Sequence, residues 1–260
     1  MADEPKFFSV NRIDLASLLT QSTGPATVTR IRDRDKELQW KSIGSDDVTT
    51  ELLQAEFKAN GINFFQDVDF VAVLNHNLLS FHFEHIVGGV FITTPGTTVA
   101  AETESFTILP ITNINTRGMK LVMDTTQVAD EEKKVGEILL LKRIFEMPDN
   151  EAPAEMGANF APVVRATQMM DNGQVLNFLR WAGNRIDRYQ TSLIFRFLPK
   201  ADYDSIRAVL KEGVFKIQPE PTTRPDEFFR VSHARAGFPW GYTTPFKGSG
   251  YTITLDLEEV

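Results

Sequence analysis

The chain has 260 residues, of which 42% are hydrophobic and 24% charged, with a formal net charge of −8 and an isoelectric point near 5.1. This length allows one large or two modest domains, and the composition is that of a folded globular protein. The acidic balance opposes non-specific binding to nucleic acid, because phosphates require a basic face. The sequence has no cysteine, which excludes disulfides, thiol catalysis and thiolate metal sites.

The N-terminus and the apolar segments bear on localisation. The first residues are acidic and lack a positively charged region followed by an apolar one, so we expect no signal peptide. The apolar runs are far shorter than the ~20 residues of a membrane-spanning helix, so we expect a soluble protein without membrane insertion. The absence of cysteine fits folding in a reducing cytoplasm.

The first part of the chain has the pattern of a β-sandwich. Residues 1–27 contain a Ser-Thr-Gly-Pro break, and we interpret them as an N-terminal arm or a first strand that lies on a sheet. Within 28–148, short apolar segments recur with turn residues between them, a pattern typical of a sandwich. The run Phe70–Leu74 is apolar at every position, which predicts a central strand buried on both faces. The expected strands cover residues 51–57, 69–75, 80–86, 89–93, 105–110, 119–124 and 136–145.

The rest of the chain predicts a smaller β-domain with one helix. Residues 148–162 contain three prolines, so we place a linker or strap at 149–164 and a second domain at 165–260. Asp202 is expected to cap a helix that Gly213 ends, and Asn172-Gly173 predicts a hairpin turn. The fold class expected is therefore mainly β. The strands expected in this domain cover residues 191–198, 214–218, 227–233 and 251–257.

Two stretches carry a family resemblance. Residues 33–42 read Asp-Arg-Asp-Lys-Glu-Leu-Gln-Trp-Lys-Ser, and residues 67–78 read Asp-Val-Asp-Phe-Val-Ala-Val-Leu-Asn-His-Asn-Leu. Together they resemble the galactose-binding-like β-sandwich of virion proteins of tailed bacteriophages, in which a "D-x-D…W-x-S" start precedes a "D-x-V-A-I-L-x-H-N-L" strand and corner. The resemblance implies a galactose-binding-like jelly-roll sandwich over residues 28–148.

The second half resembles the small β-domains of phage minor tail and distal-tail proteins, through residues 193–206, 215–221 and the ending 251–260. The two resemblances imply a structural virion protein of a phage tail tip or baseplate, assembled in the host cytoplasm as a ring or adaptor. Its expected partners are copies of itself and other phage tail proteins, with host-surface glycan as a further partner.

Two alternative functions stay open: a carbohydrate-binding receptor-recognition tail protein and a polysaccharide hydrolase. A sugar binder should gather exposed aromatic residues beside Asn, Asp or His, whereas a hydrolase should pair two carboxylates about 5–10 Å apart in a groove. The sequence has no Gly-x-Ser-x-Gly elbow and no phosphate-binding loop. We therefore expect no enzymatic activity and no cofactor.

Four residues near the resembling stretches have both a structural and a sugar-binding interpretation. Asn75, His76 and Asn77 follow the buried strand, where polar side chains satisfy the backbone groups of a corner or, alternatively, bind sugar hydroxyls. Trp40 is expected in the core at the edge of the sandwich, with a sugar-stacking platform as the alternative. We favour the structural interpretation for all four residues.

The remaining candidates concern interfaces and metals. Phe238, Trp240 and Tyr242 lie in a loop bounded by glycines, which predicts a protein interface. His82 and His85 suggest a metal site, but alternation along a strand would point them to opposite faces, so we expect no metal there. The charged run 130–134 is interpreted as a solvated loop.

Overall fold

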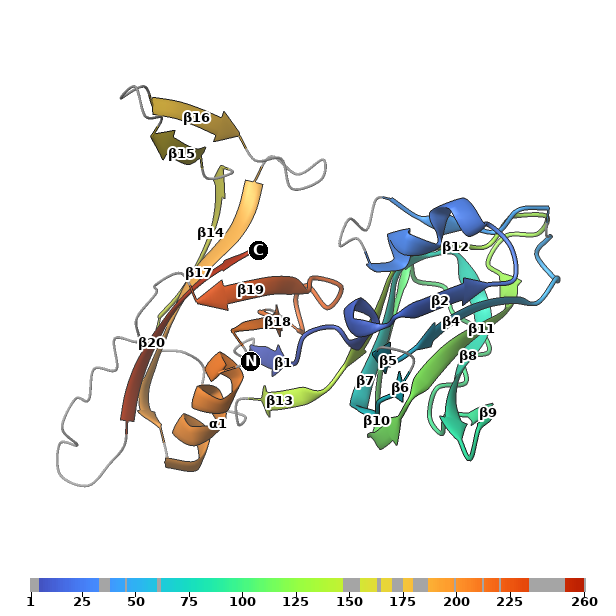
Figure 1. The fold of residues 1–260 in the computed structure, drawn as a ribbon, viewed down its shortest axis with the longest axis horizontal. Helices are drawn as coiled ribbons and strands as arrows, with labels where there is room; N and C mark the ends of the chain where they lie inside the picture. Colours follow the sequence, from blue (N-terminus) through green and yellow to red (C-terminus); the bar gives the residue numbers. More distant parts are fainter. Residues whose placement is uncertain are drawn as a thin grey trace. The chain divides into compact units, whose positions relative to one another are not determined.

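The chain forms two compact units in a computed structural model, shown in Figure 1. One unit is Ser9–Arg143, and the other combines Met1–Phe8 with Ile144–Val260. The mainly β fold class predicted from the sequence is confirmed. The structure describes residues 5–32, 38–44, 46–59, 62–146, 155–162, 165–169, 175–179, 187–198, 200–211, 213–219, 221–233 and 251–259.

The division into units differs from the boundaries expected from the sequence. Residues 1–27, expected to be an arm or a first strand on a sheet, supply strands to both units: β1 (Lys6–Phe8) pairs with β18 (Val214–Gln218) of the C-terminal unit, whereas β2 (Leu18–Gln21) pairs with β4 (Glu51–Glu56) of the sandwich. The expected linker at 149–164 contains strand β14 (Glu155–Pro162), which belongs to the C-terminal sheet. The change of unit falls earlier, between Arg143 and Ile144.

The N-terminal unit is a sandwich of two antiparallel sheets. One sheet has five strands in the order β2-β4-β11-β8-β9, and the other has four in the order β10-β7-β12-β3. Every strand expected between residues 51 and 145 is present, although the last is divided into β12 and β13. The bounds are β3 Trp40–Lys41, β4 Glu51–Glu56, β7 Gln66–His76, β8 Leu78–Val87, β9 Val90–Thr93, β10 Phe106–Thr116, β11 Gly118–Thr126, β12 Lys134–Leu141 and β13 Arg143–Glu146.

Smaller elements complete this unit. A short hairpin consists of β5 (Lys58–Ala59) and β6 (Ile62–Asn63). Two 3-10 helices, η1 (Arg12–Leu15) and η2 (Pro25–Arg32), contact β12 of the four-stranded sheet.

Alternation along the strands builds the core of the sandwich. In β4, Leu53 and Ala55 are buried between the sheets while Gln54 lies on the other face. In β7, the whole run Phe70–Leu74 is buried, as predicted for a central strand, and β7 lies between β10 and β12. The face of the five-stranded sheet opposite the core is therefore the one on which polar side chains gather.

The C-terminal unit is a seven-stranded sheet with one helix. Its strand order is β13-β1-β18-β19-β20-β17-β14, so strands from both ends of the chain meet in one sheet. Helix α1 (Lys200–Lys211) begins before the expected cap, so Asp202 lies in its first turn. Its buried residues Tyr203, Ile206 and Leu210 pack in one apolar cluster with the sheet. The other strands are β19 Phe229–His233, β17 Asp187–Leu198 and β20 Tyr251–Glu259.

Two further predictions concern this unit. The expected hairpin is present, since β15 (Arg165–Met169) pairs with β16 (Val175–Leu179), while its Asn172-Gly173 turn lies outside the described residues. Gly213, two positions beyond the end of α1, has φ of 75°, which is the left-handed conformation expected at a helix end. Within the described part of the chain, no helix is long and apolar enough to cross a membrane.

Candidate ligand-binding face

A row of five polar residues crosses the solvent face of the five-stranded sheet. Strand register places Lys120 of β11 between Glu84 of β8 and Gln54 of β4, with Thr93 of β9 and Thr20 of β2 at the two ends. We call these five residues the polar row. Since neighbouring strands lie ~4.8 Å apart, the row is about 19 Å long. It supplies donors and acceptors at regular spacing on one surface.

Ion pairs fix the centre of the polar row. The Lys120 ammonium group pairs with the Glu84 carboxylate, whose other oxygen lies 3.5 Å from Nε2 of His82. Nδ1 of His82 lies 3.8 Å from a carboxylate oxygen of Asp124. The side chains of His82, Glu84 and Lys120 are 21%, 19% and 17% exposed, so they remain accessible to solvent while being held by one another.

Apolar side chains flank the polar row on both sides. On one side, Phe91 of β9 is opposite Ile86 of β8, and the Lys120 ammonium lies 4.6 Å from the centroid of the Phe91 ring. On the other side, Val122 is opposite both His82 and Leu52. Ile86 and Val122 are almost fully buried by their neighbours. The apolar surface that stays accessible beside the polar row is therefore that of Phe91 on one side and Leu52 on the other, both of which are half-buried.

The electrostatics of Glu84 bear on catalysis. Burial raises the pKa of Glu84, but the hydrogen bond and charge of Lys120, together with His82, outweigh it, so the pKa is lowered from its usual value. Glu84 is therefore ionised at neutral pH. A general acid for glycoside hydrolysis needs the opposite shift.

The predicted corner joins the two sheets. His76 ends β7, and one residue later β8 begins in the other sheet. The His76 ring is buried: Nδ1 accepts a hydrogen bond from the N–H of Leu78 (3.1 Å), and Nε2 lies 3.0 Å from Oγ1 of Thr107. Thr107 donates in turn to the Glu102 carboxylate (2.7 Å). Because the backbone N–H occupies Nδ1, the ring is neutral with its proton on Nε2.

The two asparagines of the corner are also bound to the protein. Asn75 adopts φ of 49°, and its carbonyl accepts a hydrogen bond from the Gln39 side chain (3.0 Å). The Asn77 amide donates to the Glu131 carboxylate (3.0 Å) and accepts from the N–H of Lys134 (2.8 Å). These hydrogen bonds join the corner to neighbouring segments around Gln39 and residues 131–134. They do not converge with the polar row.

The other predicted site residues lie in three places. Trp40 is 0% exposed within the sandwich core, so its ring offers no stacking surface. His82 is the cross-strand partner of Val122, and His85 is the cross-strand partner of Met119. The two histidine side chains therefore lie on opposite sides of the sheet, as strand alternation predicts. The imidazole of His85 is bound to Thr94 Oγ1 (3.0 Å). Phe238, Trp240 and Tyr242 lie outside the described residues.

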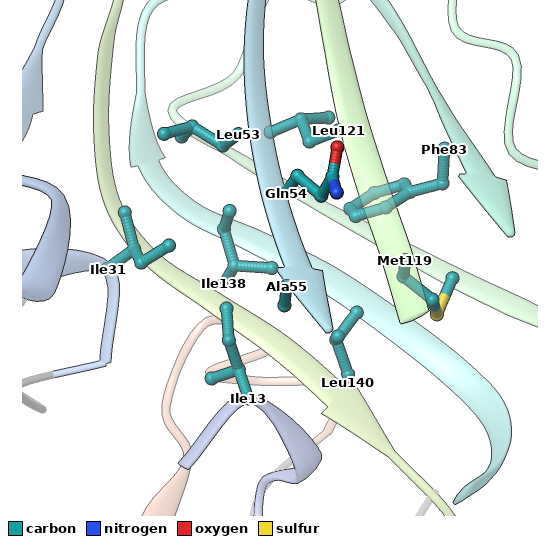
Figure 2. A pocket seen from close by; sticks show the side chains of 10 residues that line it. All are labelled: Ile13, Ile31, Leu53, Gln54, Ala55, Phe83, Met119, Leu121, Ile138 and Leu140. Atoms are coloured by element: carbon teal, nitrogen blue, oxygen red, sulfur yellow. The ribbon is translucent and has the colours of Figure 1, made fainter. Parts of the chain in front are cut away.

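The interior of the sandwich has a gap too small for a ligand. Figure 2 shows the residues around it, which come from both sheets and from the two 3-10 helices and are apolar except for Gln54. Its volume is about 10 Å³, which is about the space of one water probe. The gap is a packing feature of the core, and the solvent face of the sheet is the candidate site.

Sequence reasoning did not find the polar row. Its members lie far apart along the chain, and none belongs to a motif with fixed spacing. The one available signal was the alternation of His82 and Glu84 with Phe81 and Phe83, which marks a half-exposed strand. Which residues of other strands stand beside them depends on register, and an isolated strand pattern does not give register.

Comparison with known proteins gives structural neighbours but no sequence family. Neither a protein-family model nor a curated protein matches the chain. Chitosan-binding module 1 of a chitosanase/glucanase from Paenibacillus sp. IK-5 is 12% identical over 52% of this chain and 99% of the module, with a TM-score of 0.43. A carbohydrate-binding module of Clostridium perfringens, in complex with GalNAc-β-1,3-galactose, is 11% identical over 47% of this chain and 93% of the module, with a TM-score of 0.39.

An enzyme is also among the neighbours. A candidate α-L-fucosidase from Bacteroides thetaiotaomicron is 14% identical over 53% of this chain, with a TM-score of 0.44. The chain covers 30% of that enzyme's length. None of these three neighbours is described as a virion protein. At this level of similarity, ligand and chemistry have to be argued from the residues of this chain.

Proposed function

We propose that the N-terminal unit binds carbohydrate and that the chain is a non-catalytic receptor-recognition protein of a phage tail. The observation that supports carbohydrate binding is the polar row, with the partly exposed side chains of Phe91 and Leu52 on its two sides. A saccharide has the complementary surface, because its hydroxyl groups alternate with apolar C–H faces. Its hydroxyls would exchange hydrogen bonds with Gln54, Lys120 and Glu84, and a C–H face would pack on Phe91.

The charges of the row indicate the class of saccharide. Lys120 and Glu84 neutralise each other, so the centre of the row has no net charge. A neutral saccharide fits this balance better than a sulfated or uronic one. The ion pair also holds both side chains in place before binding, which reduces the entropy lost when a ligand orders them.

Hydrolysis is not part of the proposal. Two carboxylates of the sandwich, Glu84 and Glu102, have pKa values lowered by their hydrogen bonds even though burial raises them. Both are therefore acceptors at neutral pH rather than proton donors. A retaining or inverting hydrolase needs a carboxyl group with a raised pKa beside the sugar.

The test is glycan binding by a variant that weakens the centre of the row. We expect wild-type protein to bind at least one neutral glycan of a printed array, with an affinity then measured by calorimetry. The double substitution Gln54→Ala and Lys120→Met should weaken that binding about 30-fold or more, because two hydrogen bonds of roughly 1 kcal/mol each are lost.

The matched control is Lys134→Met. Lys134 is a partly exposed lysine of the same unit, paired with Glu131 at 3.7 Å, and it lies in the other sheet, paired in register with Lys41. It should leave glycan affinity unchanged, and circular dichroism should show both variants folded. Equal affinity of the double variant and the wild type, or no glycan bound by the wild type, would contradict the proposal.

A structural role in tail assembly is the second candidate. The resemblance of residues 33–42 and 67–78 to virion proteins favours it, as do exposed aliphatic side chains on edge strand β9. In this role Phe238, Trp240 and Tyr242 stay predicted interface residues. Replacing Phe238 and Trp240 with Ser should prevent incorporation of the folded protein into tail particles viewed by electron microscopy. Absence of the wild-type protein from purified virions would overturn both tail assignments.

A further inference from the structure

The polar row reaches both edges of the five-stranded sheet. Its outer members, Thr20 and Thr93, lie on β2 and β9, which are the first and last strands in the order β2-β4-β11-β8-β9. Thr93 is exposed and Thr20 is half-buried, and neither hydroxyl has a hydrogen-bond partner among the described residues. Each end of the row therefore offers a free hydroxyl that can both donate and accept a hydrogen bond.

The surface beside the centre of the row is filled by side chains. Gly118 lies on the same face of β11 as Lys120, two positions away, and a Cβ atom at Gly118 would lie 2.8 Å from Cδ1 of Ile86. The Ile86 side chain therefore covers the glycine. On the other side of Lys120, Val122 is buried by its neighbours. These positions have no hollow to enclose the end of a saccharide, whereas small ligands are usually held in pockets that bury most of their surface.

The two accessible apolar side chains of the face are far apart. Phe91 is two positions from Thr93 on β9, and Leu52 is two positions from Gln54 on β4, so both lie on the same face as the row. Strands β4 and β9 are separated by three strand spacings, which is ~14 Å. A single pyranose ring is much smaller than this distance and can contact only one of the two side chains. A ligand that packs on both must be an oligosaccharide.

The spacing of the row matches an extended saccharide. In an extended β-linked chain, successive rings advance by a distance close to the ~4.8 Å between neighbouring strands. Each ring of a chain laid along the row would therefore lie over about one strand, and the row would hold about four rings. Lys120 donates hydrogen bonds, Glu84 accepts them, and Gln54 and the two threonines do both. A sugar hydroxyl can pair with any of these groups.

We propose that the polar row binds an internal segment of a linear, neutral, β-linked polysaccharide, about four sugar residues long, that lies across the five strands. This inference rests on the proposed function, because it concerns how the same face holds its saccharide. The polysaccharide continues past Thr20 and Thr93 at the two edges of the sheet, so binding requires no free end of the glycan. Phe91 packs against a ring at one end of the segment, and Leu52 packs against a ring nearer the other end.

The dependence of affinity on chain length tests the proposal. The probes are linear oligosaccharides of one to six residues in four neutral series: β-1,4-linked glucose, β-1,3-linked glucose, β-1,4-linked N-acetylglucosamine and β-1,4-linked mannose. In at least one series, the affinity measured by calorimetry should rise about fivefold with each residue up to the fourth, because each adds about one hydrogen bond. From the fourth residue to the sixth it should change less than about twofold, because the row is then filled.

The outcomes separate this inference from the proposed function. If the wild type binds a glycan of the printed array but gains no affinity with chain length in any of the four series, the inference is overturned and carbohydrate binding stands. The same holds if binding requires a free terminal sugar, so that blocking the chain end abolishes it. If the wild type binds no glycan at all, the proposed function fails and the inference fails with it.

A double variant at the two ends of the row tests the orientation across the strands. Thr20→Val with Thr93→Val removes both hydroxyls and keeps β-branched side chains that suit a strand. It should weaken binding of the tetrasaccharide about tenfold or more and leave binding of the disaccharide, which the centre of the row holds, within about twofold. Thr103→Val is the matched control, since Thr103 is exposed and lies in the loop before β10, and it should change neither affinity. Circular dichroism should show both variants folded. An equal loss for both lengths in the double variant, or no loss for either, would contradict the inference.

Discussion

Trp40→Ala is expected to destabilise the protein by about 3–5 kcal/mol, which is the usual cost of truncating a large buried aromatic residue. Trp40 is fully buried in the sandwich core and pairs with Val135 of β12. The truncation would leave a cavity in the sandwich core where β3 contacts η2. The measurement is the free energy of unfolding from urea titration followed by fluorescence and circular dichroism.

Trp40→Phe is the matched control. Among the described residues no acceptor is found for Nε1 of Trp40, so the indole N–H contributes no hydrogen bond that phenylalanine would lose. Phenylalanine keeps most of the apolar volume, and its cost should be well below that of alanine. A melting temperature unchanged by Trp40→Ala would mean that the ring is not a core element and that its sugar-stacking interpretation should return.

The part of the fold that the sequence predicted best is local. The uninterrupted apolar run Phe70–Leu74 identified a central strand, and period-two alternation identified the half-exposed strand around His82. The helix near Asp202 was predicted from its apolar face, although it begins two residues earlier, at Lys200. Each of these signals lies within one element, so no knowledge of distant contacts was needed.

Long-range pairing caused the errors. Residues 1–27 were interpreted as an arm or a first strand on a sheet. Lys6–Phe8 is such a strand, but its partner Val214–Gln218, more than 200 positions away, could not be identified from those residues. Lys133 was expected in a solvated loop and is instead fully buried. Its ammonium donates to the backbone carbonyls of Asp46 (3.1 Å) and Asp47 (3.2 Å). Burial lowers its pKa, and nearby carboxylates, Glu51 first, oppose that shift.

The need to know long-range strand pairing also explains why the candidate site could not be predicted from the sequence. Glu84, Lys120 and Gln54 become one row only through the register of three strands, which their separate sequence contexts do not specify. The corner at Asn75, His76 and Asn77 could be located from sequence because its residues are consecutive. Its chemistry could not be chosen, because the partners of His76 come from residues 102 and 107.

Stability should fall by about 3 kcal/mol when the pH is lowered from 6.5 to 4, because of His76. Burial lowers the pKa of His76 to about 4, against the opposing charge of Glu102, whereas in the unfolded chain it is near 6.5. Between these two values the unfolded state binds a proton that the folded state does not. Stability therefore decreases as the pH falls through this window and this contribution levels off below pH 4. The magnitude follows from the 2.5-unit difference at ~1.36 kcal/mol per unit.

The variant that isolates this effect is His76→Gln, which does not titrate. Its unfolding free energy, measured by urea titration at half-unit steps from pH 4 to pH 7, should lose most of the slope seen in the wild type. His85, whose pKa burial also lowers, contributes in the same direction in both proteins and cancels in the difference. Glu84 and Glu102 have lowered pKa values, so their contributions are lost only below about pH 4.5, the range of an unfolded carboxyl group. Parallel curves for the two proteins between pH 4.5 and 6.5 would show that the buried imidazole at the corner takes up its proton without cost, and that the hydrogen bond from Leu78 does not hold it neutral.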